Sequence, residues 1–294
     1  MSAPQLFDRA LLARRLRRAA PSFAQAAFLK ERVSEDMLDT LSAINRSFPL
    51  ALDLGARGGV FRRILKDSPV ADKIDLLIEA DLTDAMLPGP GVVLDAEALP
   101  FGDERLNLIV SGLMLHAVDD LPGLLAQALR ALTPDGLFIG ALFGGETLKE
   151  LRACLMEAEI EARGGYGPRI APFAESPDLI ELLKRIGYAM PVVDSDRVSV
   201  SYEHPMRLLA DLRRMGETNV LIERPRKGLN KAILTRMCEL YAERFSDAEG
   251  RVTATFEIVT LSGWKPHESQ QKPLRPGSAK MRLADALGVR EIKL

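Results

Sequence analysis

The chain has 294 residues, of which 47% are hydrophobic and 27% are charged, and its formal net charge is −2. That content is enough for one large domain with extensions, and the near-neutral charge gives no overall electrostatic reason to expect nucleic acid or a membrane surface as a partner. Two cysteines are too few for a disulfide framework or a zinc site, which favours a reducing, cytoplasmic compartment. No apolar run reaches the roughly 18 residues of a membrane-spanning helix, so we expect no membrane insertion.

Arginines are concentrated among leucines and alanines near the start of the chain, at Arg9, Arg14, Arg15, Arg17 and Arg18. Mitochondrial presequences have a similar composition. The amphipathic spacing favours instead a helix from Leu6 to about Ala20 that ends before Pro21. We expect residues 1–45 to form a helical cap over the mouth of a ligand site.

Residues 46–262 alternate apolar runs of strand length with helical patterns, which is typical of a doubly wound α/β sheet. We expect strands at Leu50–Leu54, Asp75–Ala80, Gly91–Leu94, Leu106–Val110, Leu137–Phe143, Val192–Val200 and Val252–Leu261. Helices are expected near 59–66, 121–132, 146–163, 177–186, 204–215 and 227–245. The pattern predicts a Rossmann-like, seven-stranded, mostly parallel sheet with helices on both faces, followed by a polar tail over residues 263–294.

The first of these strands breaks into a glycine-rich turn, Gly55-Ala56-Arg57-Gly58-Gly59. Glycines allow a tight turn and a close approach of backbone to a ligand, and the following helix N-terminus favours negative charge. The spacing is not the G-x-G-x-x-G of dinucleotide-binding sites. Together with Asp53, the turn resembles the D-x-G-x-G-x-G loop of class I S-adenosylmethionine-dependent methyltransferases, with Arg57 in place of the middle glycine.

Two aspartates follow the next two strands. Asp81 is placed to accept hydrogen bonds from ribose hydroxyls, although a helix N-cap or turn aspartate is an alternative role. Asp95 is placed to accept from an adenine amine while the backbone N–H of Ala96 meets a ring nitrogen. Leu82 flanks the base or belongs to the core. The joint occurrence of these acids with Asp53 at successive strand ends favours an adenosyl ligand.

Arg57 leaves two interpretations open. If its position requires positive φ, a side chain there costs on the order of 1 kcal/mol and takes space that the methionyl group needs. If the neighbouring glycines supply the flexible positions, the guanidinium can clamp the carboxylate of the ligand.

Longer segments carry a family resemblance. Residues 95–101 and 106–111 resemble the type 11 methyltransferases, which include the malonyl-carrier-protein methyltransferases of the biotin pathway. Residues 115–122, 143–148 and 263–270 resemble the mitochondrial complex I assembly factor 5 family and its bacterial relatives, and that resemblance extends from Phe7 to about Ala279. It implies a methyltransferase fold, S-adenosylmethionine as ligand, and an arginine-rich start that belongs to the folded unit.

The same resemblance implies hydroxylation of an arginine side chain in a subunit of respiratory complex I. The chain departs from the family in three places beside the expected pocket. The family's Cys-Gly-Arg-Gly turn is replaced by Ala56-Arg57-Gly58-Gly59. Asn107 replaces an aspartate, and Ala117 replaces an aromatic residue. A member of the organellar branch would lie in the mitochondrial matrix.

His116, at the end of the fourth strand, is the best candidate for a catalytic base. Its alternative role is a hydrogen-bonded histidine that closes the loop. The other histidines are His204 and His267, and the three lack the spacing of a two-histidine, one-carboxylate iron site. We therefore expect no metal.

Several functions remain open at this point. The chain is expected to bind S-adenosylmethionine and to modify a protein side chain, by methyl transfer or by arginine hydroxylation. Alternatives are carboxyl methylation of a small molecule or carrier protein, and a non-catalytic module that binds a complex I subunit through the basic tail, at Lys265, Lys272, Arg275 and Lys280. The sequence does not indicate an oligomeric state.

Overall fold

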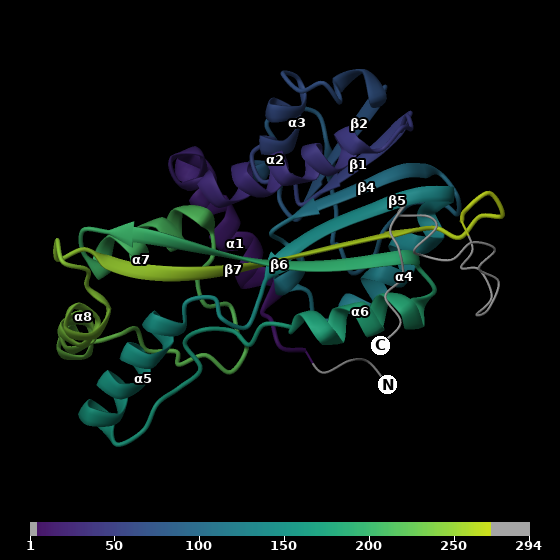
Figure 1. Ribbon diagram of the computed structural model, residues 1–294. Helices are drawn as coiled ribbons and strands as arrows, with labels where there is room; N and C mark the ends of the chain where they lie inside the picture. Colours follow the sequence, from purple (N-terminus) through teal and green to yellow (C-terminus); the bar gives the residue numbers. More distant parts are fainter. Residues whose placement is uncertain (1–4, 272–294) are drawn as a thin grey trace, which may run out of the picture.

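A computed structural model describes residues 5–271 as a single seven-stranded sheet with helices on both faces (Figure 1). The strand order is β3-β2-β1-β4-β5-β7-β6. The strands are β1 (Leu50–Leu54), β2 (Leu76–Asp81), β3 (Val92–Val93), β4 (Leu106–Gly112), β5 (Leu132–Phe143), β6 (Ala189–Tyr202) and β7 (Val252–Trp264). The first five are mutually parallel, and β7 is antiparallel to both β5 and β6. The predicted Rossmann-like fold is confirmed.

The position of a ligand crevice follows from the strand order. β1 lies between β2 and β4, with Leu52 in register with Ile78 on one side and Ile109 on the other. From β1 the chain continues to β2 and β3 on one side of the sheet, and it then crosses to β4 and β5 on the other side. In open α/β sheets ligands bind at such a switch point, outside the carboxyl ends of the strands.

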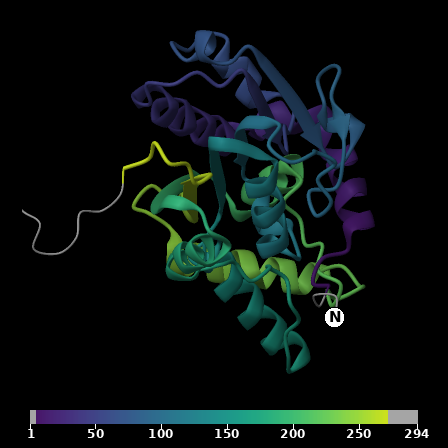
Figure 2. The ribbon, with the colours of Figure 1, turned by 90° about the vertical axis from the view of Figure 1, so that its right-hand side faces the viewer.

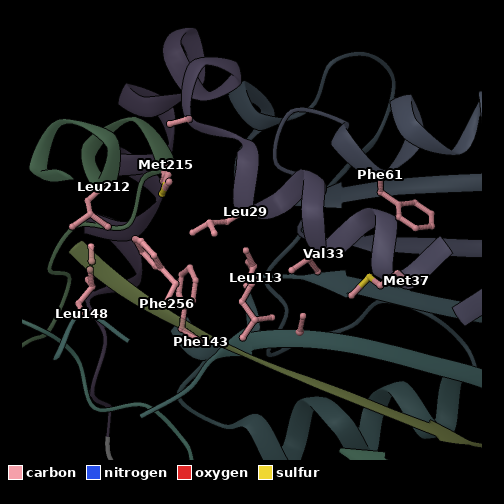
Figure 3. Close-up of a cluster of buried hydrophobic side chains, with 14 of the residues drawn as sticks. Leu29, Val33, Met37, Phe61, Leu113, Phe143, Leu148, Leu212, Met215 and Phe256 are labelled. Atoms are coloured by element: carbon pink, nitrogen blue, oxygen red, sulfur yellow. The ribbon is translucent and has the colours of Figure 1, made fainter. Parts of the chain in front are cut away.

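The helices cover both faces of the sheet. They are α1 (Arg9–Ala19), α2 (Phe28–Ala43), α3 (Val60–Leu65), α4 (Leu121–Ala131), α5 (Lys149–Arg163), α6 (Ser176–Ile186), α7 (Pro205–Met215) and α8 (Lys231–Phe245). Figure 1 shows α2 and α3 on one face and α4 and α6 on the other. Leu29, Val33 and Met37 of α2 lie in one continuous core cluster with Phe143 of β5 and Phe256 of β7 (Figure 3).

The antiparallel pair β6 and β7 extends past the parallel strands, and α5, α7 and α8 pack on that extension. Three strands differ most from their predicted boundaries. β5 starts five residues earlier, because Leu132 pairs with Leu106. β6 is longer at both ends. β7 continues to Trp264, where Gly263 and Trp264 pair with β5, so the strand runs into the segment that we expected to be tail. Residues 272–294 of that tail lie outside the described residues.

The predicted N-terminal helix is present. α1 begins at Arg9, after an N-cap aspartate, Asp8, whose side chain accepts from the backbone N–H of Leu11. Its buried side chains Leu12 and Leu16 pack in a cluster beside the strand ends. The segment before it forms a β-bridge from Phe7 to Leu221, and Figures 1 and 2 both place this purple segment beside the green segment after α7.

Candidate functional site

The turn after β1 has a left-handed backbone. φ is +83° at Gly55, +77° at Gly58 and +69° at Gly59. A Cβ atom at Gly59 would lie 2.5 Å from a Pro88 side-chain carbon, so a larger residue does not fit there. Arg57 also has positive φ, +44°, in a region that side chains other than glycine rarely adopt. Ala56 is buried in the same turn.

The guanidinium of Arg57 is turned into the protein. The residue is 3% exposed, its backbone N–H donates to Asp81 Oδ2 at 3.0 Å, and its Nε lies 3.7 Å from the same oxygen. Its Nη1 lies 3.7 Å from Glu217 Oε1. In the described conformation, therefore, the side chain is paired with acids of this chain.

Asp81 is the last residue of β2, whereas the prediction placed it directly after the strand. Its Oδ1 accepts from the N–H of Leu82 at 2.8 Å, and the residue is 3% exposed. The half-buried Leu82 lines the small cavity next to it. The N-cap alternative does not apply, because Thr83 caps the short helix that follows, Asp84–Met86.

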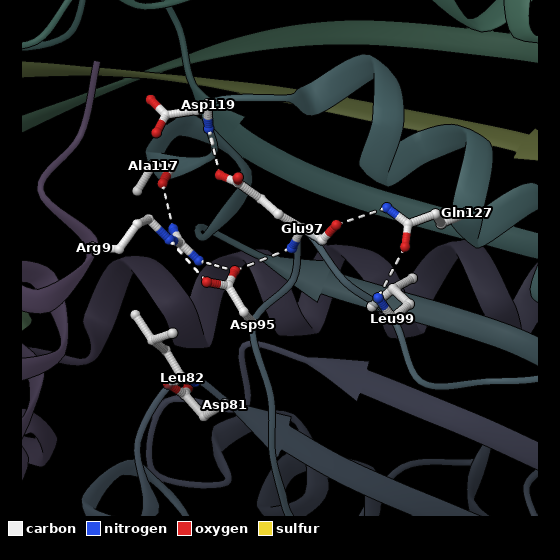
Figure 4. Close-up of polar contacts among 9 residues, drawn as sticks. All are labelled: Arg9, Asp81, Leu82, Asp95, Glu97, Leu99, Ala117, Asp119 and Gln127. Carbon is white, nitrogen blue, oxygen red and sulfur yellow. Dashed lines mark hydrogen bonds and ion pairs between the residues drawn. The ribbon is translucent and has the colours of Figure 1, made fainter. Parts of the chain in front are cut away.

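Asp95 is held by the N-terminal helix (Figure 4). Arg9 binds both oxygens of its carboxylate through Nε and Nη2 and donates from Nη1 to the carbonyl of Ala117 at 2.9 Å. The backbone N–H of Glu97 donates to the same carboxylate at 3.1 Å. Ala96 is buried between them. Arg9 was not among the residues that the sequence singled out for this site.

A buried lysine lies beneath the glycine turn and was also missed. Lys30 of α2 donates from Nζ to the carbonyls of Gly55, at 2.8 Å, and Gly112, at 2.9 Å. Asp53 Oδ1 lies 4.0 Å from this ammonium, and neither Asp53 oxygen has a hydrogen-bond partner within residues 5–271. Burial raises the pKa of Asp53 to about 6 and lowers the pKa of Lys30. The sequence could have indicated Lys30, because this lysine takes a core-facing position in an amphipathic helix.

The space at the strand ends is small. The cavity bounded by Arg9, Arg57, Asp81 and the α1 leucines measures about 20 Å³, which is room for about one water molecule. Ligand pockets measure roughly 300 Å³ or more. The acids fit an adenosyl ligand by type and position, but the ligand does not fit in this conformation, because α1 and the two arginines fill the space.

A larger cavity, of about 310 Å³, lies next to it. Apolar side chains from α1, α5, α7 and the ends of β5 and β7 form most of its wall. The polar side chains on that wall include His116, Glu217, Arg15 and Arg213. The cavity is therefore large enough for an amino-acid side chain and has an acid, an imidazole and three guanidinium groups around it, those of Arg15, Arg169 and Arg213.

His116 lies on a short 3₁₀ turn, Leu115–Ala117, which begins three residues after the end of β4. Its ring packs against Phe143 with 4.6 Å between ring centroids, and its Nε2 lies 3.0 Å from Glu217 Oε2. Its Nδ1 is buried without a hydrogen-bond partner in the described part of the chain. Burial opposes ionisation of Glu217, but the charges of His116 and Arg57 outweigh it, so the pKa of this carboxyl lies below its usual value.

Glu217 is a member of the site that sequence reasoning missed. It comes directly after Gly216, which ends α7 with φ of +82°. A Cβ atom at Gly216 would lie 2.9 Å from Leu16 of α1, so glycine allows α1 to approach this corner. The sequence feature that could have indicated Glu217 is its place directly after a glycine at the end of a helix.

Two of the three departures from the family pattern have clear structural roles. Asn107 accepts from the N–H of Leu50 and donates to Thr133, so it links strand starts far from the crevice. Ala117 is buried and lines both the small and the large cavity. A larger residue at 117 would fill part of that space.

The other histidines and the basic residue Lys265 that the sequence singled out do not line either cavity. His204 caps α7, and His267 interacts with Ser269. Lys265 donates to the carbonyl of Arg130 and faces Glu104. Within residues 5–271 no group of three histidine, cysteine, aspartate or glutamate side chains is placed to hold a metal, and no helix has the length and hydropathy to cross a membrane. Lys272, Arg275 and Lys280 lie outside the described residues.

Together, the doubly wound sheet with its antiparallel β7, the glycine turn after β1 and the acids after β2 and β3 define a class I S-adenosylmethionine-dependent methyltransferase fold. The family model for a methyltransferase domain matches residues 52–140. Among solved structures, YcgJ from Bacillus subtilis superposes with a TM-score of 0.54 and 13% identity, over 80% of this chain and 99% of that one. BH2331 from Bacillus halodurans, a candidate methyltransferase, gives a TM-score of 0.53 and 16% identity, over 79% and 98%.

The chain belongs to the family of the arginine hydroxylase NDUFAF5. It is 39% identical to the mitochondrial enzyme of Homo sapiens, over 93% of this chain and 81% of that one. It is 37% identical to that of Danio rerio, over 95% and 89%. A malonyl-[acyl-carrier protein] O-methyltransferase from Halorhodospira halophila is 29% identical, over 97% of both chains. The chain is thus an enzyme of the methyltransferase type.

Proposed function

We propose that this enzyme modifies an arginine side chain of a protein in the 310 Å³ cavity and that S-adenosylmethionine binds in the adjoining crevice. The observation that carries the proposal is the pair of His116 and Glu217 on the cavity wall, with 3.0 Å between Nε2 and Oε2. The arginine-hydroxylase relatives, 37% and 39% identical over nearly the whole chain, support the choice of substrate.

The adenosyl ligand would be held by the residues that the sequence singled out. Asp81 would accept from the ribose hydroxyls, and Asp95 and the N–H of Ala96 would meet the adenine beside Leu82. The glycine turn, from Gly55 to Gly59, would face the rest of the ligand. Since Arg9 now occupies the Asp95 carboxylate and Arg57 lies against Asp81, we infer that binding requires Arg9 to leave and Arg57 to shift.

Glu217 is the side chain of the cavity that suits a guanidinium substrate. Glu217 stays ionised because its pKa is lowered, and a carboxylate is the natural partner of a guanidinium group. The same carboxylate orients the ring of His116 through Nε2, and Nδ1, which has no hydrogen-bond partner within residues 5–271, would take a proton from the reacting group when the ring is neutral. Phe143 and Phe173 lie beside that ring and limit the access of water.

The resemblance to the complex I assembly factor family also supports a proposal for the partner and the compartment. We propose a subunit of respiratory complex I as the protein substrate, and a cytoplasmic location for a bacterial enzyme or the mitochondrial matrix for an organellar one. We also propose the domain limits: a helical cap to about residue 45, the methyltransferase-like domain to the end of β7 at Trp264, and the polar segment after it.

A second candidate is methylation of a carboxyl group on a carrier protein or a small molecule. Arg15 and Arg213 on the cavity wall favour it, because guanidinium groups recognise carboxylates. The 29% identical malonyl-carrier-protein methyltransferase points the same way.

Tandem mass spectrometry of acceptor proteins tests these alternatives. Purified enzyme is added to protein extract from cells that lack its gene, with S-adenosylmethionine in one arm and dioxygen with a reductant in the other. The proposal predicts a methyl group or an oxygen atom on arginine, lost with Glu217→Gln and kept with the surface control Arg185→Gln. A methyl ester on a carboxyl group supports the second candidate. Unmodified proteins in both arms support the non-catalytic module.

A further inference from the structure

One surface around α1 is strongly basic although the whole chain carries a net charge of −2. α1 contains five arginines and no acidic residue. We define the α1–α7 basic face as Arg14, Arg15, Arg18, Arg213 and Arg224. Three of these residues, Arg14, Arg18 and Arg213, are exposed, and the other two are half-buried.

The members of this face lie close enough to repel one another. The pKa of Arg15 is lowered, first by burial and then by the charges of Arg18, Arg224, Arg213 and Arg14. Arg224 is the one member that forms an ion pair in the described part of the chain, with Asp8 at 3.1 Å. Arg17, beside this face, is paired with Asp84 and is excluded from it. The positive charge of the face is therefore largely uncompensated.

The basic face adjoins the large cavity. Arg15 and Arg213 belong to both, and a depression of about 180 Å³ lies among Leu11, Arg14, Arg15 and Arg18. A macromolecule bound on this face can therefore place one of its side chains in the cavity.

We propose that the α1–α7 basic face docks an acidic segment of the protein whose side chain is modified. This inference rests on the proposed function and adds the chemistry of the docking partner. Complementary charge speeds encounter and fixes orientation, which suits an enzyme that must find one side chain on a large partner.

The composition of the face favours an acidic protein over other anionic partners. The apolar residues Leu12, Leu16 and Ala19 of α1 are buried, so the helix offers no apolar stripe for insertion into a lipid surface. The face contains no aromatic side chain, whereas single-stranded nucleic acids bind on aromatic stacking platforms.

Fluorescence anisotropy with a labelled ten-residue glutamate peptide tests the docking face. The full chain is compared with Arg14→Glu/Arg18→Glu and with the control Arg105→Glu/Arg185→Glu, which reverses two exposed arginines outside the face. We expect the first variant to bind the peptide roughly tenfold more weakly and the control to bind as the unmodified chain does. Added salt should weaken the binding, because exposed charges are screened.

Three results would overturn the docking face: no binding by the unmodified chain, equal loss in both double variants, or binding of phosphatidylglycerol vesicles in place of the peptide. Melting temperatures check folding, and Arg14→Gln/Arg18→Gln, which removes charge without reversing it, should give an intermediate loss. Titration with S-adenosylmethionine should be the same for all variants. Peptide binding without modification of any protein would refute the proposed function alone, and modification without a role for these arginines would refute the docking face alone.

Discussion

Arg9 of α1 binds both oxygens of Asp95, the carboxylate that lies where an adenine amine is expected. The pair is partly exposed, with 20% of the Arg9 side chain and 41% of the Asp95 side chain accessible. Together with the buried leucines of α1, this contact leaves a cavity of about 20 Å³ at the strand ends. If the adenosyl ligand binds as proposed, the N-terminal helix competes with it for the same acid.

Removing this competitor should strengthen ligand binding. A partly exposed ion pair contributes up to about 1 kcal/mol, so Arg9→Ala should bind S-adenosylhomocysteine about fivefold more tightly by isothermal titration. The matched control is Arg17→Ala, because Arg17 pairs with the exposed Asp84 on the same helix. Weaker binding by Arg9→Ala would mean that Arg9 contacts the ligand directly.

Arg57 should hinder binding more than it helps. Its φ of +44° costs on the order of 1 kcal/mol for a residue other than glycine, and its guanidinium lies against Asp81. We expect Arg57→Gly to bind S-adenosylhomocysteine more tightly. Arg57→Ala keeps the strain and removes the guanidinium, so it should recover most of that gain. If both variants bind more weakly, Arg57 is a clamp for the ligand carboxylate.

Glu217 and His116 should act as a unit in catalysis. A positioned acid or base contributes typically 10² to 10⁴ in rate, so His116→Gln should reduce turnover of an identified protein substrate by about a hundredfold or more. Glu217→Gln should reduce turnover similarly and shift the pH profile of the rate. The charged neighbours of Glu217 lower its pKa, and the substitution removes this ionised carboxylate from the imidazole of His116. The melting temperature of each variant serves as the control. An unchanged rate for both variants would remove the pair from the mechanism.

Asp53 should give stability a defined pH dependence. Burial raises its pKa from 3.8 to about 6, against the opposing charge of Lys30. Between these two values the folded state binds more protons than the unfolded state, so the Asp53 contribution to stability falls as pH rises from about 4 to about 6 and stays lost above.

Urea unfolding of the unmodified chain and Asp53→Asn across this range measures the Asp53 contribution. The free energy of unfolding of the variant should equal that of the unmodified chain near pH 4. As the pH rises, it should exceed that of the unmodified chain by up to about 3 kcal/mol. A stability difference that does not change with pH would show that Asp53 titrates normally.

Local pattern was enough to predict the sheet and the places of Asp53, Asp81 and Asp95. Apolar runs identify buried parallel strands, and such strands carry the residues after them to one edge of the sheet. The start of β5 was misjudged. The Thr133-Pro134-Asp135-Gly136 sequence is typical of a helix stop, but Asp135 takes a φ of +64° within the strand and its N–H donates to Lys265, a partner far along the chain.

The groups that fill the crevice were not predictable, because their partners are distant in sequence. Arg9 and Asp95 are 86 positions apart, and Lys30 and Gly112 are 82 apart. Glu217 reaches His116 across 101 positions. A single sequence shows the residue types but not these pairings, so Asp95 and His116 were predicted while their partners Arg9 and Glu217 were missed.

Titration of S-adenosylmethionine into the purified chain and into Asp81→Asn tests the central claim most directly. The account predicts micromolar binding to the unmodified chain and at least tenfold weaker binding to the variant, because the ribose hydroxyls lose an ionised acceptor. Absence of heat in both titrations, with melting temperatures unchanged by the ligand, would contradict the adenosyl site and leave a non-catalytic binding module as the better description.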